Sequence, residues 1–432
     1  CLFTTLQRAK HQVRTAYGDL IQFYGGENWS IPMHGVGQGN GAGPAIWAAV
    51  STPILNYVRS KGFGCELISP ITSLQTKYVG YAFVDDTDLI QTSPSSTDSN
   101  EVIKGLQGSI ETWDEGLKLT GGALVPEKTF WHLIDFKWTA GKWSYKMIDE
   151  CPGTISVQDL QGNKKTLRRF EVNRAETTLG VDLAPDGSTH QQESKMFNAA
   201  TIWADSMRTG RISKSDVWTA IDSTIWRTLT NPLPALNLTV QQCERIMRPI
   251  LHYGLPALGI YRNFPRKMVF APQKYMGLGF KHLHTLQEIA RLKDMINHTF
   301  QSSITGNLYR TSTELLLTEL GVSENFSQVN YTHLHTLVTD SLVKSTWKFL
   351  YQHNIYLEHD IKFPHQRQGD TTLMQAFLDL QLTVEELQQL NECRLFLRAL
   401  HLSDITDGSG LNITDDAWQG PANDRYRTTS WP

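Results

Sequence analysis

The spacing of the apolar residues changes near residue 190, and this change constrains the fold more than any other feature of the chain. Before it, short runs rich in aromatic and branched side chains are separated by Gly, Pro, Asn and Asp, as strands are by turns. After it, apolar residues recur every three or four positions, as on one face of a helix. The sequence therefore predicts an α+β region followed by helical regions.

The length, charge and cysteine content exclude several classes of protein. The 432 residues are enough for about two to four domains. The formal net charge is −3 at pH 7, so a polyanion could be bound only at a local basic patch. The five cysteines lack CxxC spacing, which indicates neither a disulfide framework nor a zinc site and favours an intracellular location in the cytoplasm or nucleus. Apolar runs fall short of the roughly 18 residues of a membrane span, so no membrane partner is expected.

Two adjacent carboxylates, Asp85 and Asp86, stand between two apolar runs, with no basic residue beside them. The runs predict two strands and Asp favours turns, so both acids are expected at the tip of a hairpin. Like charges this close are costly unless a cation binds them, and Mg²⁺ accepts one or two carboxylates together with substrate phosphates. A solvated Asp-Asp turn gives the same pattern. Asp88 is interpreted as a solvated strand residue.

Other segments predict further elements. Five glycines between residues 35 and 43 allow the backbone to approach a ligand closely, and a helix is expected to begin at Pro44. The stretch up to about residue 14 is interpreted as the end of a helix. The sequence also predicts a helix after the loop 92–100, a hairpin of strands 131–138 and 142–148, and strands at 167–172 and 178–183.

Four short motifs occur in an order that is similar to one family. Gly37-Gln38-Gly39 with Gly43-Pro44 comes first, Phe83-Val84-Asp85-Asp86 follows about 45 residues later, and Lys128-Thr129 and Leu179-Gly180-Val181 come next. Each motif is weak alone. Together they resemble the palm of a reverse transcriptase of the non-LTR retrotransposon type, over roughly residues 1–300.

The resemblance implies a right-hand polymerase. Residues 1–189 would be part of the palm, an antiparallel sheet with helices, and 190–300 an all-helical thumb that clamps a duplex. Residues 301–432 would form a helical C-terminal region without an assigned role. The implied activity is RNA-directed DNA polymerisation, with an RNA template, a DNA primer, deoxynucleoside triphosphates and two Mg²⁺ or Mn²⁺ ions.

The resemblance gives three residues a place in the chemistry. Asp85 would bridge the two metal ions, Asp86 would support them, and Lys128 would lie beside the triphosphate. Two metal ions about 3.5–4 Å apart can stabilise the attacking 3′ oxygen and the leaving pyrophosphate. A lysine there can neutralise charge or donate a proton to the leaving group. An ordinary exposed lysine is the alternative interpretation of Lys128.

The resemblance also implies binding roles. Gln38, Gly39 and Phe83 would contact the incoming nucleotide and the template, and Leu179 with Gly180 would grip the primer end. Gln38 could instead cap its own loop, and a Leu before a Gly is common in an ordinary strand core.

Positive charge gathers in two places that predict contacts with a phosphate backbone, although a solvated charged face gives the same pattern. Trp131 and Trp143 could stack on bases, with core packing as the favoured alternative. The first basic cluster is Lys164, Lys165, Arg168, Arg169 and Arg174, and the second is Arg208, Arg211 and Lys214.

One acid of the family pattern has no counterpart. The family places another Asp at the end of an earlier strand, and Asp19 lacks that strand's aromatic-rich context. We therefore expect a polymerase fragment that is inactive, or nearly so, by itself. Two alternatives stay open. One is an RNA-directed RNA polymerase, in which Gly rather than Val84 usually precedes the Asp pair. The other is a degenerate relic that binds nucleic acid without chemistry.

Overall fold

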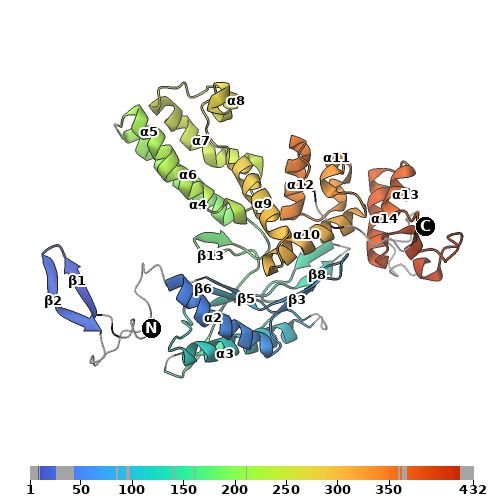
Figure 1. The fold of residues 1–432 in the computed structure, drawn as a ribbon, viewed down its shortest axis with the longest axis horizontal. Helices are drawn as coiled ribbons and strands as arrows, with labels where there is room; N and C mark the ends of the chain where they lie inside the picture. Colours follow the sequence, from blue (N-terminus) through green and yellow to red (C-terminus); the bar gives the residue numbers. More distant parts are fainter. Residues whose placement is uncertain are drawn as a thin grey trace. The chain divides into compact units, whose positions relative to one another are not determined.

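The computed structural model describes residues 8, 10–25, 43–83, 86–93, 98–139, 142–159, 161–210, 212–358, 361 and 367–418. The described chain combines helices with short strands, so the broad α+β class is confirmed (Figure 1). The chain divides into two compact units. The first comprises Cys1–Cys65, Tyr78–Leu133 and Ile148–Phe170, and the second comprises Glu66–Lys77, Ile134–Met147 and Glu171–Pro432.

Two helices and a hairpin organise the first unit. α2 (Gly43–Ser60) and α3 (Ser99–Leu119), both predicted, pack against each other, and they contact β5 (Gly80–Phe83) and β6 (Asp86–Leu89), respectively. A Cβ at Gly116 would overlap the side chain of Ile54, so glycine permits the close approach of the two helices. The core between these elements contains Ile54, Val58, Val79, Trp113 and Leu117.

Two further ladders contribute to a second apolar cluster of the first unit. β7 (Phe130–His132) pairs in parallel with β12 (Arg168–Phe170), and β10 (Ser156–Gln158) pairs antiparallel with β11 (Lys164–Thr166). Apolar side chains from these ladders and from α3 form one cluster. Its members are Ile103, Ile110, Trp131, Leu133, Cys151, Ile155, Val157 and Leu167.

The interpretation of the first residues as a helix end is wrong for residues 10–14. They belong to β1 (Lys10–Thr15), which pairs antiparallel with β2 (Gly18–Gly25). Gly18 closes the turn with a φ of +115°, a conformation that residues with a Cβ rarely adopt. Arg14 Nε donates to Asp19 Oδ1 at 2.7 Å across the turn, so local contacts favour the hairpin.

The strands after residue 130 differ from the prediction in their pairing. The predicted strand 131–138 is broken, because β7 pairs with β12 whereas β8 (Phe136–Thr139) pairs with β9 (Lys142–Tyr145). β3 (Cys65–Ile68) pairs with β4 (Gln75–Tyr78), and β13 (Glu176–Thr178) pairs with β14 (Val181–Leu183). Throughout the described residues the ladders are two-stranded, rather than parts of the one antiparallel sheet that the resemblance implies.

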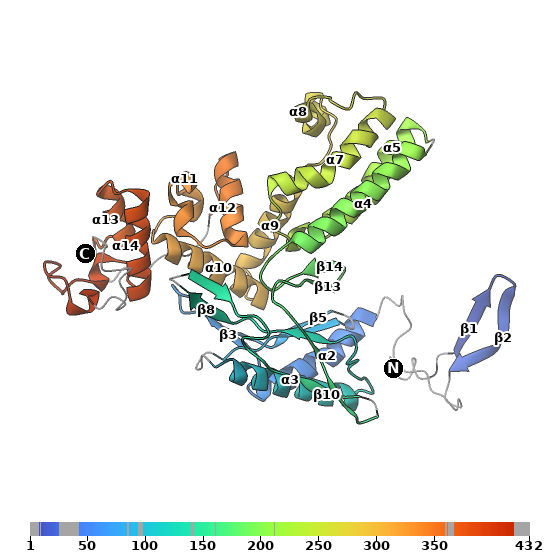
Figure 2. The same ribbon diagram turned by 180° about the vertical axis from the view of Figure 1, so that it is seen from behind.

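The helices that follow residue 190 confirm the predicted helical period. α4 (His190–Thr209) and α7 (Val240–Ala257) lie side by side (Figure 2). The helix of α5 (Lys214–Ala220) and α6 (Trp226–Thr230) is continuous through a π-helical turn at Ile221–Ile225. α8 (Arg266–Phe270) and α9 (Leu283–Thr299) follow. Their shared core includes Met196, Val217, Leu229, Ile246, Ile250, Leu255 and Leu283.

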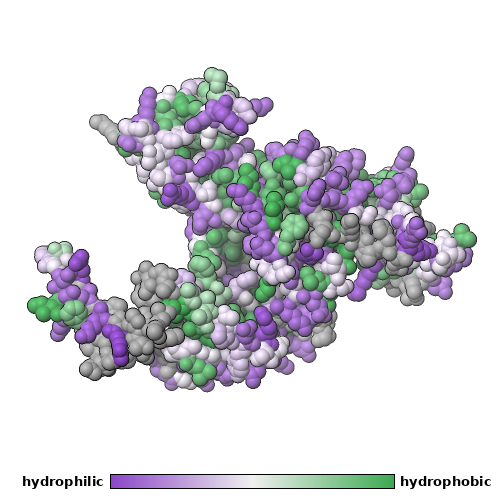
Figure 3. All heavy atoms as spheres, viewed as in Figure 1, coloured by the Kyte–Doolittle hydropathy of each residue, from purple (hydrophilic) through white to green (hydrophobic). Residues whose placement is uncertain are grey.

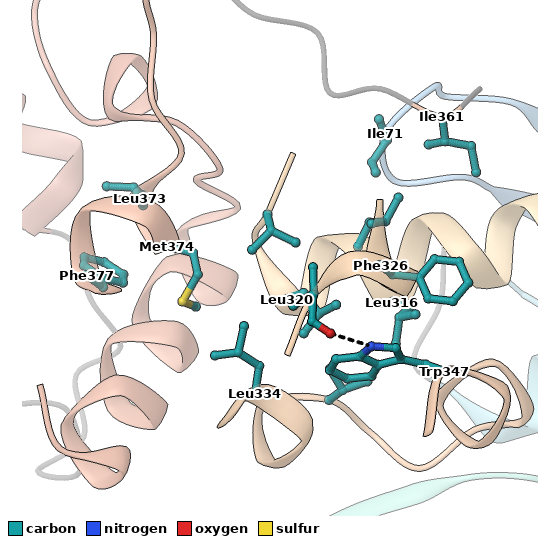
Figure 4. Close-up of a cluster of buried hydrophobic side chains, with 14 of the residues drawn as sticks. Ile71, Leu316, Leu320, Phe326, Leu334, Trp347, Ile361, Leu373, Met374 and Phe377 are labelled. Carbon is teal, nitrogen blue, oxygen red and sulfur yellow. Dashed lines mark hydrogen bonds between the residues drawn. The ribbon is translucent and has the colours of Figure 1, made fainter. Parts of the chain in front are cut away.

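The C-terminal helices have a separate core cluster. They are α10 (Ile304–Leu320), α11 (Tyr331–Leu334), α12 (Leu342–His353), α13 (Leu373–Asp379) and α14 (Val384–Leu397), whose N-terminus is capped by Thr383. Trp347 is fully buried, and its Nε1 donates to the carbonyl oxygen of Val329 at 3.2 Å (Figure 4). The cluster also contains Leu316, Leu320, Phe326, Leu334, Leu373 and Met374.

A buried carboxylate links this helical region to a loop far away in the sequence. Glu314 of α10 has no exposed surface. Its carboxylate accepts hydrogen bonds from the backbone nitrogens of Ile71 and Thr72, both at 3.0 Å, and from Thr72 Oγ1 at 2.6 Å. Ile71 belongs to the same core cluster as α10. The loop between β3 and β4 is therefore fixed on the C-terminal helices.

Replacing Glu314 should release this loop. The change Glu314→Ala leaves three donors without their acceptor, and we expect it to destabilise the fold by about 2–4 kcal/mol. Denaturant unfolding measures the loss, and amide exchange at Ile71 and Thr72 locates it. Glu244→Ala, at an exposed position of α7, is the matched control. Unchanged exchange at the two amides in Glu314→Ala would contradict this account.

Candidate functional site

The predicted acidic hairpin is present in its described part. β5 and β6 pair antiparallel, and Phe83 lies opposite Asp86, which leaves residues 84 and 85 as the connection. Asp85 lies outside the described residues, as do Gln38 and Gly39 of the glycine-rich motif. The structure therefore locates one of the two predicted metal ligands, Asp86, at the first position of β6.

The hairpin has an inner and an outer face because successive side chains of a strand alternate. Leu89 on the inner face packs against the core of the first unit. The outer face carries Tyr81 and Phe83 opposite Asp88 and Asp86, and the two rings are 44% and 61% exposed. Two carboxylates and two aromatic rings thus share one accessible surface, which we call the acidic face.

A glycine makes this pairing possible. Gly80 pairs with Leu89 and has a φ of +157°. A Cβ at this position would overlap the backbone carbonyl of Asp88. Any larger residue would therefore push β6 away from β5 and change the position of Asp88 relative to Tyr81.

The electrostatics of the acidic face fit a cation. Partial burial raises the pKa of Asp88 above its ordinary value, and the charge of Asp86 raises it further. Within the described chain, neither carboxylate has a basic side chain at ion-pair distance. A divalent cation at Asp86 would relieve this repulsion, and Asp85, the other predicted ligand, lies outside the described residues. The described residues include no set of three His, Cys, Asp or Glu side chains placed to hold a metal.

Lys128 lies in the first unit, in the loop that joins α3 to β7. Its side chain is exposed, and its backbone nitrogen donates to the carbonyl oxygen of Val125 at 3.1 Å. An exposed position suits both a residue that meets a triphosphate and an ordinary surface lysine.

The first basic cluster has two kinds of members. Lys164 and Lys165 are exposed on β11, as a phosphate contact requires. Arg168 donates to the carbonyl oxygen of Glu127, and Arg169 donates to that of Cys151. These two arginines therefore also fix neighbouring loops. Arg174, the fifth member, forms an ion pair with Glu176 at 2.9 Å, and a role in phosphate binding stays a prediction for all five residues.

The two tryptophans singled out in the sequence have different environments. Trp131 is 4% exposed, with the guanidinium of Arg169 lying 4.8 Å from its ring centroid, so stacking on external bases is excluded for it. Trp143 is 48% exposed, so the favoured interpretation of core packing is wrong for this residue.

Leu179 and Gly180 form the two-residue turn between β13 and β14. The predicted single strand 178–183 is therefore wrong, because the chain reverses in its middle. Both turn residues have positive φ, +52° and +83°, as a type I′ hairpin turn requires. Leucine rarely adopts this conformation, and such strain is concentrated at functional positions. Leu179 is 52% exposed, which excludes the core interpretation of this side chain.

The β13–β14 hairpin is fixed to α4. Asp182 accepts hydrogen bonds from Thr177 Oγ1 at 2.6 Å and from Lys195 Nζ at 2.9 Å, and its backbone nitrogen donates to Gln192 Oε1. These contacts hold the exposed turn in a defined place within the second unit.

A basic surface around α8 was missed in the sequence. No Asp or Glu occurs from residue 245 to 287, although this stretch contains seven Lys and Arg. The sequence therefore contains a local excess of positive charge, but these residues lie too far apart to form a continuous basic run. Hydrophilic and hydrophobic residues are interleaved over this end of the second unit (Figure 3). The exposed members, which we call the α8 basic surface, are Arg262, Arg266, Lys267, Lys274, Tyr261 and Tyr275.

The comparisons with known proteins identify no relative. No protein-family model matches the sequence, and no curated protein or solved structure matches it either. Within the described residues, every helix is too short or too polar to cross a membrane.

Titration of Asp88 tests the electrostatics of the acidic face. Because its pKa is raised in the folded protein, its protonated form stabilises the fold at low pH, and this contribution is lost as the pH rises through that value. Removing the neighbouring charge with Asp86→Asn should lower the pKa of Asp88. Millimolar Mg²⁺ should also lower it in the parent protein, because the cation competes with the proton.

Carbon-13 NMR of the carboxyl group measures both effects. Asp149→Asn removes a charge from an exposed turn of the same unit and should leave the titration of Asp88 unchanged. A pKa insensitive to both Asp86→Asn and Mg²⁺ would mean that the acidic face holds no cation.

Proposed function

We propose that this chain carries the nucleotidyl-transfer region of an RNA-directed DNA polymerase. The register of the β5–β6 hairpin is the observation that best supports the proposal. Phe83 pairs with Asp86, so the first and last residues of the motif Phe83-Val84-Asp85-Asp86 lie opposite each other at the ends of the two strands. The turn of such a hairpin would present both acids at one edge, as two-metal chemistry requires.

The proposed reaction joins a nucleotide to a primer. The primer 3′ oxygen forms a bond to the α-phosphorus of a nucleoside triphosphate, the bond to the leaving pyrophosphate breaks, and the 3′ hydroxyl proton passes to solvent. Two Mg²⁺ ions would supply Lewis-acid stabilisation of the attacking and leaving oxygens. Asp85 and Asp86 would hold the ions by their carboxylates. Lys128 would lie beside the pyrophosphate and offset its charge.

Other parts of the chain fit binding roles in the same proposal. The exposed Leu179-Gly180 turn, fixed to α4 through Asp182, would support the primer end. Helices α4 to α9 would be the thumb, and Gln38 with Gly39 would contact the nucleotide and template. The C-terminal helices, with their own core cluster, have no role in this proposal.

The α8 basic surface supports a polyanionic partner. Arg262, Arg266, Lys267 and Lys274 form no ion pair with any described residue. Among the described residues no acidic side chain pairs with these charges, and a phosphate backbone would offset them while releasing counterions. We therefore assign this surface to the backbone of the bound nucleic acid.

Neutralising two of these charges should weaken nucleic-acid binding at low salt. With Arg266→Ala and Lys267→Ala combined, the slope of log affinity against log salt should fall by about two, one for each lost phosphate contact. Fluorescence anisotropy with a labelled duplex measures the slope. Lys293→Ala, at an exposed position of α9, should leave it unchanged. An unchanged slope in the double variant would remove the α8 basic surface from the proposal.

Primer extension on an RNA template tests the activity. The protein to assay joins this chain to an upstream strand that bears the missing acid, because two ions need more than one Asp pair. With Mg²⁺ and deoxynucleotides, Asp85→Ala or Asp86→Asn should lower extension by about a thousandfold or more. Glu115→Gln, which removes an exposed charge from α3, should extend like the parent.

The same assay separates the alternatives. Equal extension by Asp85→Ala and the parent would refute the proposed mechanism. A preference for ribonucleotides would indicate an RNA polymerase. Duplex binding without extension, even with the upstream acid restored, would indicate a non-catalytic relic.

A further inference from the structure

A three-residue turn follows α8, at the end of the helical region where α4 and α7 also end (Figure 1). It consists of Lys274, Tyr275 and Met276, and we call it the Tyr275 turn. Three backbone hydrogen bonds of 2.9–3.0 Å hold the chain that returns from this turn against α8. The donors are Leu278, Gly279 and Phe280, and the acceptors are the carbonyl oxygens of Met268, Ala271 and Val269, respectively. The turn is therefore anchored, and Tyr275 has a defined place.

The backbone of the Tyr275 turn is strained. Met276 has a φ of +62°, a left-handed conformation that residues with a Cβ rarely adopt. A Cβ at Gly277 would overlap the carbonyl oxygen of Ala271, so only glycine lets the chain pass here. Strain of this kind is concentrated at functional positions. In this turn it accompanies two side chains held in solvent, because Tyr275 is 67% exposed and Met276 is 89% exposed.

A cation lies over one face of the tyrosine ring. Lys274 Nζ is 4.8 Å from the centroid of the Tyr275 ring. Since a ring has two faces and Tyr275 is largely exposed, the other face is open to a ligand. Lys274 is also exposed, and it forms no ion pair with any described residue. An open ring face and an uncompensated positive charge therefore meet at one place.

We propose that the Tyr275 turn binds an unpaired nucleotide, with its base stacked on the open face of Tyr275 and its phosphate near Lys274. Stacking on an aromatic ring is available to every base, and cationic side chains attract the phosphates on either side. The anchored turn holds the ring in place, so little freedom is lost when a base binds. This inference rests on the assignment of the α8 basic surface to nucleic acid in the proposed function. It adds that this surface holds a single strand.

The composition of the turn favours nucleic acid over a lipid surface. Helices that bind at a membrane interface present a broad apolar face. The large apolar side chains around α8 instead pack against the core of the helical region, and they are Phe264, Phe270 and Leu278. Between residues 259 and 281, all of them described, this leaves two tyrosines and Met276 as the exposed large apolar side chains. An acidic peptide would use the positive charges, but it would not require the open ring face.

Fluorescence anisotropy of the full chain, without Mg²⁺ or nucleotides, tests the proposal. The labelled probes are a short oligothymidine and an abasic oligomer with the same number of phosphates. Tyr275→Ala should lower the affinity for the oligothymidine about tenfold and leave the affinity for the abasic oligomer unchanged, because only the oligothymidine has bases to stack.

Two variants control for the loss of the ring. Tyr275→Phe keeps an aromatic ring and should bind both probes like the parent. Tyr356→Ala removes a tyrosine of nearly the same exposure, 68%, from the C-terminal helical region and should also bind like the parent.

Four outcomes would overturn the proposal. They are unchanged binding of both probes by Tyr275→Ala, an equal loss for both probes, displacement of the oligothymidine by polyglutamate as effectively as by unlabelled oligothymidine, and a Tyr275→Ala effect confined to vesicles that contain phosphatidylserine. The third outcome would indicate an acidic peptide and the fourth a lipid surface. Because the assay needs neither metal ions nor the acid pair, its failure is distinguishable from a failure of primer extension.

Discussion

Burial of one side of the β5–β6 hairpin determines which residues its other side can expose. Leu89 packs into the core that α2 and α3 share, and this contact fixes the register of both strands relative to the helices. A shift of one residue would bury Asp86 and Asp88 in an apolar core, at a cost far larger than the hairpin could tolerate. The packing of Leu89 therefore determines that Asp86 and Asp88 are exposed on the other face, and the repulsion between these two acids is a consequence of that packing. Gly80 is part of the same constraint, because only its missing side chain lets the two backbones approach.

The second unit uses a different means to present functional groups. Its two exposed hairpins, β8–β9 and β13–β14, hold apolar side chains in solvent instead of in a core. In β13–β14 the strained Leu179 turn is held by the contacts of Asp182 with Thr177 and Lys195. In β8–β9 the rings of Phe136, Trp143 and Tyr145 support one another across the ladder. Both arrangements leave hydrophobic surface uncovered, which is unfavourable unless a partner covers it.

Patterns of neighbouring residues in the sequence predict several elements of the fold. The helices 43–60 and 99–119 and the two strands of the acidic hairpin follow from apolar spacing and capping residues. The Leu179 turn could not be predicted in this way, because leucine gives no turn signal and its positive φ is imposed by the surrounding contacts. The parallel pairing of β7 with β12 joins residues nearly forty positions apart, which no local pattern reports. The sequence alone predicts an ordinary solvated residue at Asp88, because Asp86 and Tyr81 come close to its side chain only when the two strands pair. The α8 basic surface depends on folding in the same way, since its charges lie on several elements.

The Glu314 contact has a consequence for the order in which the chain can fold. The loop between β3 and β4 emerges from the ribosome 242 residues before its acceptor does. Until α10 has been made, the backbone nitrogens of Ile71 and Thr72 must remain hydrated and the side chain of Ile71 has no core to enter. Contacts of such long sequence separation form late and slowly. The loop of this early hairpin thus reaches its final conformation only after α10 has been synthesised, and its two amides stay exposed to water throughout that interval.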